Sequence, residues 1–213
     1  MTELKRPAPL HPRRHDREQF DSGEPVLDEW LRRYAGQNRR RDTAATWLIA
    51  DADDVVVAYA SVAMTGIDRS AAADKLAMGA PDPVPALLLG RLAVDHRYAH
   101  LGIGTTLVAH VLATAVELNE KAACRAVVVT AINRQARTWW ERFGFRPFAP
   151  DEPDQLDLYL LTSEIDANPG RKAPPCTQSG TLWLWPRSCP FESSGLGSAS
   201  CWATLPTGAI TSS

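Results

Sequence analysis

Two glycines at the junction between a buried strand and a helix are the residues that point most directly to chemistry. The apolar run 87–94 predicts a buried strand, and Gly102 and Gly104 follow it just before a helical pattern begins. The first N–H groups of a helix lack intrahelical partners, and glycine lets an anion approach the backbone closely. The segment therefore predicts a diphosphate site, although a tight turn alone would also use glycine here.

The neighbouring residues exclude two common phosphate loops. No Lys-Ser or Lys-Thr pair follows the glycines, as a nucleoside-triphosphate loop requires. A dinucleotide-binding turn would add a third glycine and an acidic residue after the next strand, whereas Glu120 precedes that strand.

The elements that must position this turn follow from hydrophobic periodicity. In chain order, the pattern predicts a helix from 24 to about 36, strands 46–50 and 55–64 as a hairpin, a loop with a short helix over 66–86, a strand at 87–94, a helix at 102–119, a strand at 126–131, a helix at 133–143, and strands 145–148 and 156–161. Residues 1–23 read as an entry segment with at most one short strand. This order predicts an α/β fold with a mixed sheet, in which strands 87–94 and 126–131 pair in parallel.

The composition changes after Ile165. Residues 166–213 are rich in Ser, Gly, Pro and Thr and show neither helical nor alternating periodicity. We expect one domain over 1–165 and a disordered or loosely packed tail over 166–213, which resembles a segment foreign to the domain. Its apolar patch 182–185 predicts an aggregation-prone segment or a docking peptide, and we favour the first.

Bulk properties limit the classes of function. The 213 residues carry a formal net charge of -2, which argues against a generally basic nucleic-acid-binding surface. No apolar run is long enough to span a membrane, and the N-terminus lacks the apolar stretch of a secretory signal, so we expect a cytoplasmic protein without membrane contact. The four cysteines show no zinc-ligand spacing, so no metal is expected.

Together these residues resemble the GNAT family of N-acetyltransferases. The family's first motif, Gln/Arg-x-x-Gly-x-Gly/Ala between a strand and a helix, aligns with residues 99–104. Its second, Asn-x-x-Ala-x-x-Phe-Tyr-Glu-Lys-x-Gly-Phe, aligns with residues 133–145, which contain Asn133, Ala136 and Trp139-Trp140-Glu141-Arg142-Phe143-Gly144-Phe145. Two ordered matches over a span of roughly residues 7 to 162 are more specific than either motif alone.

The resemblance implies acetyl-CoA as the cofactor and a twisted, mostly antiparallel GNAT-type sheet with helices on both faces. It implies that the backbone of Leu92, Ala93 and Val94 pairs with the pantetheine arm and that Asn133 bonds the pantetheine side. The backbone N–H groups implied to hold the pyrophosphate belong to the turn Ala99, His100, Leu101, Gly102, Ile103, Gly104 and Thr105.

A closer resemblance is to a branch of this family, the TacT-like toxins that acetylate aminoacyl-tRNA. Segments 20–31 and 89–95 carry it, as Phe20-Asp21-Ser22-Gly23 before Leu27-Asp28-Glu29-Trp30-Leu31 and as Leu89-Gly90-Arg91-Leu92-Ala93-Val94-Asp95. This resemblance implies aminoacyl-tRNA as acceptor and a ribbon-helix-helix antitoxin as partner. A homodimer is left open.

The acceptor chemistry agrees with that branch. An α-amine has a reference pKa of about 7.7 to 8.0 and is largely neutral near neutral pH, whereas a lysine amine near about 10.4 needs a strong base. No Asp or Glu is placed in the central strands as that base. Asp95 ends its strand and is expected to cap the following turn rather than to act in catalysis.

Two residues depart from the family pattern. Ala99 occupies the Gln/Arg position of the glycine motif, which removes one polar phosphate contact but leaves the backbone donors. Trp140 occupies the position of the tyrosine that the family uses to protonate the departing thiolate. An indole N–H donates a hydrogen bond but does not transfer its proton, so Trp140 either stabilises the thiolate through its N–H or is core in a slow or inactive enzyme. Tyr34, Tyr59 and Tyr98 are the fallback acids.

Arginines are the candidates for contact with RNA. Arg91 lies in a buried strand, where it would meet an RNA phosphate or pair with Asp95. Arg32 and Arg33 lie on the first predicted helix, and Arg39, Arg40 and Arg41 follow its predicted end. All six would form a track along tRNA, but the five outside the strand also fit a solvated helix end.

Three functions remain open: a tRNA-acetylating toxin, a GNAT enzyme for a small amine such as an antibiotic or polyamine, and a catalytically weak scaffold that binds CoA. An acidic acceptor pocket would favour the small amine, and Trp140 favours the scaffold.

Overall fold

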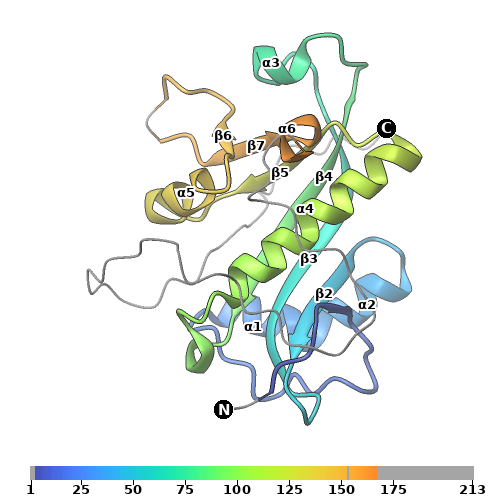
Figure 1. Cartoon of the computed structure of the whole chain (residues 1–213), viewed down its shortest axis with the longest axis vertical. Helices are drawn as coiled ribbons and strands as arrows, with labels where there is room; N and C mark the ends of the chain where they lie inside the picture. Colours follow the sequence, from blue (N-terminus) through green and yellow to red (C-terminus); the bar gives the residue numbers. More distant parts are fainter. Residues whose placement is uncertain (1–2, 153, 167–213) are drawn as a thin grey trace.

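The computed structural model describes residues 3–152 and 154–166, and within them the chain folds around one seven-stranded sheet (Figure 1). The strands lie in the order β1-β2-β3-β4-β5-β7-β6, and only the β4–β5 pair is parallel. The predicted mixed, mostly antiparallel α/β fold is thereby confirmed. The strand bounds are β1 Ala8–Pro9, β2 Ala45–Ala50, β3 Val56–Ile67, β4 Val84–Val94, β5 Ala126–Thr130, β6 Arg146–Pro147 and β7 Asp157–Leu161.

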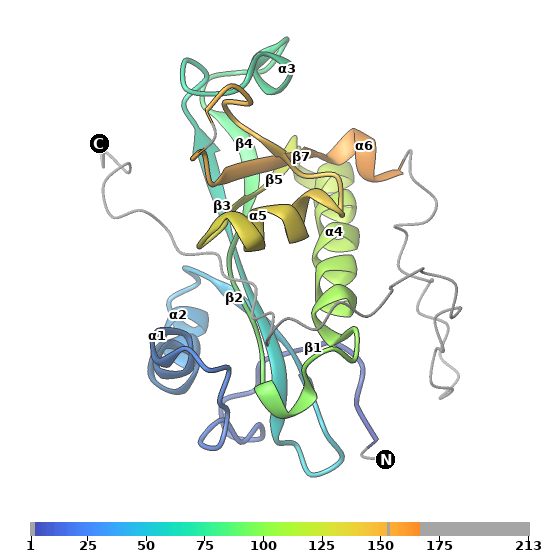
Figure 2. The same ribbon diagram turned by 90° about the vertical axis from the view of Figure 1, so that its left-hand side faces the viewer.

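Helices cover both faces of the sheet (Figure 2). The long helix α4 (Ile103–Ala122) packs on one face, and the first helical segment packs on the other. Strand alternation separates these two cores, because Ile49 of β2 points toward α4 whereas its neighbours Leu48 and Ala50 point toward the first helix. The other helices are short: α3 Asp74–Ala77, the 3-10 turn η2 His96–Tyr98, α5 Arg134–Glu141 and α6 Thr162–Asp166.

The first helical segment runs through α1 (Pro25–Glu29), a π-helical stretch η1 (Trp30–Tyr34) and α2 (Ala35–Arg40). The prediction that it ends near Gly36 was wrong. Pro12 of the entry segment packs against Gly36, where an added Cβ would lie at an ordinary van der Waals distance of 3.6 Å, and this packing offsets the low helix propensity of glycine. The helix therefore carries Arg39 and Arg40, and the chain leaves it through Asp42, whose φ of 54° is left-handed.

An aromatic stack fixes the π-helical stretch to the sheet. The ring of Trp30 stacks on Tyr59 of β3 with centroids 5.7 Å apart and an interplanar angle of 12°. The Tyr59 hydroxyl donates to the Leu27 carbonyl at 2.9 Å. Trp30 is thereby held against the centre of the sheet.

Strands β3 and β4 are longer than predicted. The predicted loop 66–86 is shortened from both ends, because pairing continues as far as Ile67 opposite Val84, and α3 lies in what remains. The closing strand predicted at 145–148 is reduced to Arg146–Pro147.

The strand–helix–strand unit that holds the glycine turn is present as predicted. β4 and β5 pair in parallel with α4 between them in sequence. Their register, however, covers only residues 86–88 of β4 and 126–128 of β5. In Figure 1, β3 and β4 run on toward the lower part of the molecule, whereas β5, β6 and β7 stay in its upper part.

The predicted tail with its apolar patch lies outside the described residues, apart from Asp166 at the end of α6. Within 3–152 and 154–166, no helix has the length and apolar character needed to cross a bilayer. The same residues place no group of three or more His, Cys, Asp or Glu side chains where it could hold a metal ion.

Candidate functional site

The backbone of β4 opens on one side beyond Leu88, where its pairing with β5 stops. On the other side, the Asp95 N–H donates to the Val57 carbonyl of β3 at 2.8 Å. Because backbone groups alternate along a strand, Ala93 also faces β3, and Leu92 and Val94 direct their N–H and C=O groups toward the opened side. These groups offer an extended polar ligand the same pattern of bonds that another strand would make.

The turn after β4 brings unpaired donors to the end of this opened edge. Gly102 caps α4 with a φ of 75°, and His100 has a φ of 64°, which is uncommon for a residue with a side chain. The first N–H groups of this 20-residue helix, on Ile103, Gly104 and Thr105, have no intrahelical acceptor. A hollow of about 110 Å³ lies here, lined by Val94, His96, Tyr98, Ala99, His100, Gly102, Ile103, Gly104, Thr105 and Trp139.

The two glycines have different structural needs. Gly102 requires glycine because of its left-handed backbone. At Gly104 an added Cβ would lie 3.5 Å from Val94 Cγ2 and 3.8 Å from Trp139 Cζ2, which are ordinary van der Waals distances. The tight turn thus explains Gly102 but not Gly104, whose missing side chain leaves room in the hollow.

Of the other residues expected to hold cofactor, Ala99 and His100 lie in the same turn, whereas Asn133 lies at the start of α5 and does not line the hollow. Ala99 follows η2 and contributes only its backbone and a methyl group to the hollow. His100 is exposed. Asn133 caps α5, since its side-chain oxygen accepts from the Ala136 N–H at 2.8 Å, and its amide nitrogen remains a donor.

Trp140 is fully buried on α5, and its Nε1 has no hydrogen-bond partner among the described residues. Its ring packs edge-on against Trp139 and Phe145, with centroids 4.8 and 5.4 Å away. Buried N–H donors are nearly always hydrogen-bonded. The indole N–H of Trp140 is therefore either left unsatisfied by the packing of the core or available to bond a ligand.

No carboxylate on the central strands is free to act as a base. Burial raises the pKa of Asp95, but hydrogen bonds from Arg97 outweigh it and hold that pKa below its ordinary value. Arg97 Nε donates to Asp95 Oδ1 at 2.8 Å, and the Arg97 N–H makes the predicted cap of η2. Asp95 is therefore an ionised structural group, and its partner is Arg97 rather than Arg91.

The three fallback acids lie in different places. Tyr59 is buried, burial raises its pKa, and its hydroxyl is bound to Leu27, so it is a poor proton donor. Tyr34 is 46% exposed. Tyr98 lines the hollow at the start of α4.

Arg91 projects from β4 onto the face covered by the first helix. Its guanidinium carbon lies 4.5 Å from the centroid of the Trp30 ring. A cation over an aromatic face gains about 0.5 to 2 kcal/mol, less than the several kcal/mol that desolvation of an ion costs. Nothing in the sequence positions of Trp30 and Arg91 indicates that their side chains contact each other, so this pair was not predictable.

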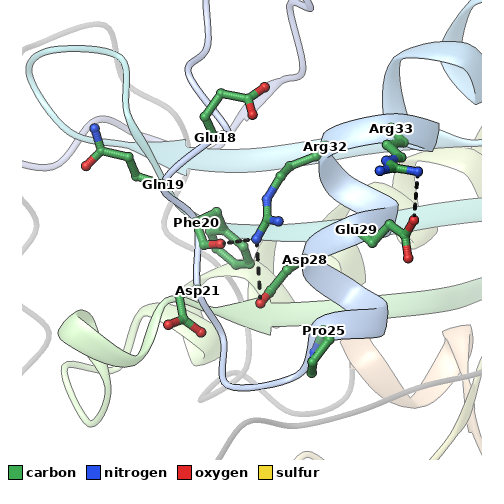
Figure 3. Close-up of a pocket in the computed structure, with 9 residues that line it drawn as sticks. All are labelled: Glu18, Gln19, Phe20, Asp21, Pro25, Asp28, Glu29, Arg32 and Arg33. Carbon is green, nitrogen blue, oxygen red and sulfur yellow. Dashed lines mark hydrogen bonds and ion pairs between the residues drawn. The ribbon is translucent and has the colours of Figure 1, made fainter.

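A larger hollow, of about 950 Å³, lies between the loop 18–21 and the first helix (Figure 3). Arg32 points into the loop, where it donates to the Phe20 carbonyl at 2.9 Å and lies 3.9 Å from Asp28. Arg33 pairs with Glu29 at 3.1 Å on the exposed side. Arg32 therefore holds the loop 18–21 against the first helix. The exposed ion pair between Arg33 and Glu29 is weak, so it hardly prevents Arg33 from binding another anion.

The remaining arginines of the expected track are exposed at the end of the first helix. Arg39, Arg40 and Arg41 have no ion pair within the described part of the chain. The structure therefore separates the six arginines: three lie together on the surface, Arg33 neighbours them on the same helix, Arg32 is tied to a loop, and Arg91 lies on the sheet.

The family model described as the acetyltransferase (GNAT) family matches residues 10–145. The "tRNA-acetylating toxin" of Mycobacterium tuberculosis (strain ATCC 25618 / H37Rv) is 32% identical over 148 residues, which cover 70% of this chain and 87% of that relative.

Solved structures share the fold at lower identity. AtaT complexed with acetyl-methionyl-tRNAfMet is 23% identical with a TM-score of 0.70, over 78% of this chain and 98% of that one. A mutant of KacT is 21% identical with a TM-score of 0.71 and the same coverage. AtaTR bound with AcCoA is 23% identical with a TM-score of 0.66, over 78% of this chain and 97% of that one.

The substitution Gly104→Ala separates the needs of the fold from those of a ligand. We expect the unfolding temperature to stay the same or rise, because alanine favours a helix by up to about 1 kcal/mol over glycine. We expect the affinity for coenzyme A, measured by calorimetry, to fall about tenfold or more, because the methyl group occupies the hollow.

Gly36→Ala is the matched control, since Gly36 is also a helical glycine where an added Cβ meets only ordinary van der Waals contacts, but it lies outside the hollow. It should keep or raise the unfolding temperature and leave coenzyme A binding intact. Unchanged binding by Gly104→Ala would place the diphosphate elsewhere.

Proposed function

The chain belongs to the acetyltransferase (GNAT) family, and we propose that it is a toxin that transfers acetyl from acetyl-CoA to the α-amine of an amino acid esterified to tRNA. The observation that carries this proposal is the likeness to the M. tuberculosis tRNA-acetylating toxin, which extends over most of that relative. Acetylation of this amine would block translation, and charged tRNA places the activity in the cytoplasm.

The residues present fit acetyl-CoA. The opened edge at Leu92 and Val94 supplies backbone donors and acceptors for the amides of a pantetheine arm. The start of α4 supplies N–H groups for a pyrophosphate, and Gly104 leaves space for it. When bound, acetyl-CoA supplies an activated acetyl group as a thioester.

The chain's own groups favour an acceptor that needs no strong base. The α-amine of an aminoacyl ester has a reference pKa of about 7.7 to 8.0, so a neutral fraction is present at neutral pH. The one buried carboxylate at the end of β4, Asp95, is committed to Arg97. A lysine side chain would require a base that β4 and β5 do not provide within the described residues.

Trp140 is the residue we assign to the departing sulfur. Its indole N–H keeps its proton at all useful pH values and acts only as a hydrogen-bond donor. A thiol has a pKa of about 8.5 and leaves readily as thiolate, so a donor that steadies the negative charge is sufficient. The unpaired Nε1 supports this role.

We further propose that a ribbon-helix-helix antitoxin restrains the enzyme and that the enzyme works as a homodimer. AtaT, which is similar in structure, is solved with the antitoxin AtaR and as the AtaT–AtaR complex bound to DNA. The acetyltransferase domain would occupy residues 1–165.

A small-amine acetyltransferase is the second candidate, because the larger hollow of Figure 3 is acidic. Four carboxylates, those of Glu18, Asp21, Asp28 and Glu29, line it beside two arginines. Asp28 accepts hydrogen bonds from the N–H and hydroxyl of Ser22, and Glu29 pairs with Arg33, which leaves Glu18 and Asp21 to attract a cationic acceptor.

Charged tRNA distinguishes these functions directly. We expect purified protein to move labelled acetyl from acetyl-CoA onto one or a few aminoacyl-tRNAs in a scan of amino-acid identities, and to leave spermidine and aminoglycosides unlabelled. Label on the small amines alone would establish the second candidate. Label on neither, with coenzyme A still bound, would indicate the catalytically weak scaffold.

Variants of Trp140 test its role at the sulfur. We expect Trp140→Phe to lower kcat about tenfold or more, since a donor to developing negative charge is lost. Trp140→Tyr should retain or exceed the parent rate. Coenzyme A affinity and unfolding temperature, measured alongside, control for damage to the aromatic cluster; equal kcat in all three proteins would remove Trp140 from the mechanism.

The exposed arginines give a test that depends on salt. We expect Arg40→Gln to reduce the slope of log affinity for charged tRNA against log salt concentration by about 0.7 to 1, the contribution of one phosphate contact. Lys121→Gln removes the same charge from the exposed far end of α4 and should leave the slope unchanged. Equal slopes for Arg40→Gln and the parent would exclude Arg40 from the RNA-binding surface.

A further inference from the structure

Arg91 differs from the other partly buried arginines near the first helix. Its Nε is buried without a hydrogen-bond partner, as are the Nε atoms of Arg17 and Arg32, but those two arginines bond through their terminal nitrogens. No ion pair or hydrogen bond joins its guanidinium to any residue in 3–152 or 154–166, and only the Trp30 ring supports it. By contrast, Arg32 and Arg97 on the same side of the molecule are bound to backbone carbonyls and carboxylates.

An unpaired guanidinium is costly in a half-buried place. Desolvation lowers the pKa of Arg91, which records that the protein destabilises its charge. Charges in such positions are usually paired, so the missing partner is expected to come from a ligand. The Trp30 ring holds the guanidinium carbon in place without accepting its N–H groups, which leaves these groups for an acceptor on a ligand.

The place of Arg91 on the sheet suggests what that ligand is. Arg91 adjoins Leu92, whose backbone faces the opened edge, but its side chain lies on the face of the first helix, opposite α4. Acetyl-CoA held at the start of α4 would reach the opening from one face of the sheet. An amine substrate that enters from the other face would meet Arg91 beside the reacting groups.

We propose that Arg91 binds the phosphodiester on the 5′ side of the terminal aminoacylated nucleotide and so selects amines that are linked to a nucleotide. This proposal rests on the proposed function. A phosphate close to the reacting amine is absent from lysine side chains, polyamines and aminoglycosides. A guanidinium fork fits two phosphate oxygens at once.

Two minimal acceptors isolate this contact. One is a 3′-aminoacylamino-3′-deoxyadenosine, and the other is the same compound with a 5′-phosphate; both carry the amino acid that is labelled in the charged-tRNA scan. In the parent protein, we expect the 5′-phosphate to raise kcat/KM about tenfold, the contribution of a charge-assisted hydrogen bond.

Arg91→Gln should abolish this difference, and Arg91→Lys should retain part of it, because a point charge replaces the planar fork. The ratio between the two acceptors is taken within each variant, so a general loss of activity or folding does not affect it. Lys121→Gln should keep the parent ratio.

The outcomes are distinct. Acetylation of both acceptors with equal kcat/KM by the parent, or an unchanged ratio in Arg91→Gln, would overturn the role of Arg91 and leave the proposed function intact. Failure to acetylate charged tRNA itself would overturn the proposed function. A binding partner other than RNA would be indicated if Arg91→Gln weakened antitoxin binding but not the phosphate effect.

Discussion

The separation of β4 from β5 beyond Leu88 and Val128 is the constraint on which the site depends. If β4 and β5 stayed paired along their whole length, their backbone N–H and C=O groups would bond to each other and none would be available to a ligand. Here the opening leaves Leu92 and Val94 with free backbone groups in the middle of the domain, where such groups are costly unless they are bonded. The same opening joins the two faces of the sheet. An acetyl donor bound on the side of α4 and an amine acceptor bound on the side of the first helix would therefore meet at one place.

Packing holds the opening in position from both faces. On one face, α4 extends from the glycine turn across β2, β3 and β4, so its first turn is fixed relative to the end of β4. On the other face, the Trp30–Tyr59 stack and the Tyr59 hydroxyl bond fix the first helix to β3. Trp140 closes the region from α5, and its large buried ring outweighs an unsatisfied N–H worth about 1 to 3 kcal/mol, so an orphan donor is tolerable there without a ligand.

Much of this was predictable because local rules govern it. The strand–turn–helix at 87–119 has strong periodicity and glycines at its junction, and both appear where expected. Three features were not predictable, because each depends on contacts between distant segments. The first helix passes through Gly36 because Pro12 packs there; β3 and β4 extend because they pair with each other; and Arg32 is bound by the Phe20 carbonyl, which only the folded loop presents. The stack of Arg91 on Trp30 belongs to the same class.

The distribution of charged side chains indicates which acceptor substrate suits this fold. The net charge of -2 predicts little general attraction to RNA, so any selective binding must come from cations that the fold leaves without partners. Arg32 and Arg97 are used to hold loops, and exposed carboxylates surround the larger hollow. Arg39, Arg40 and Arg41 lie apart from these on the surface, and Arg91 lies beside the opened edge. Cations placed both far from and next to the reacting groups suit a long polyanion whose end carries the amine, whereas a small cationic amine would gain nothing from either set.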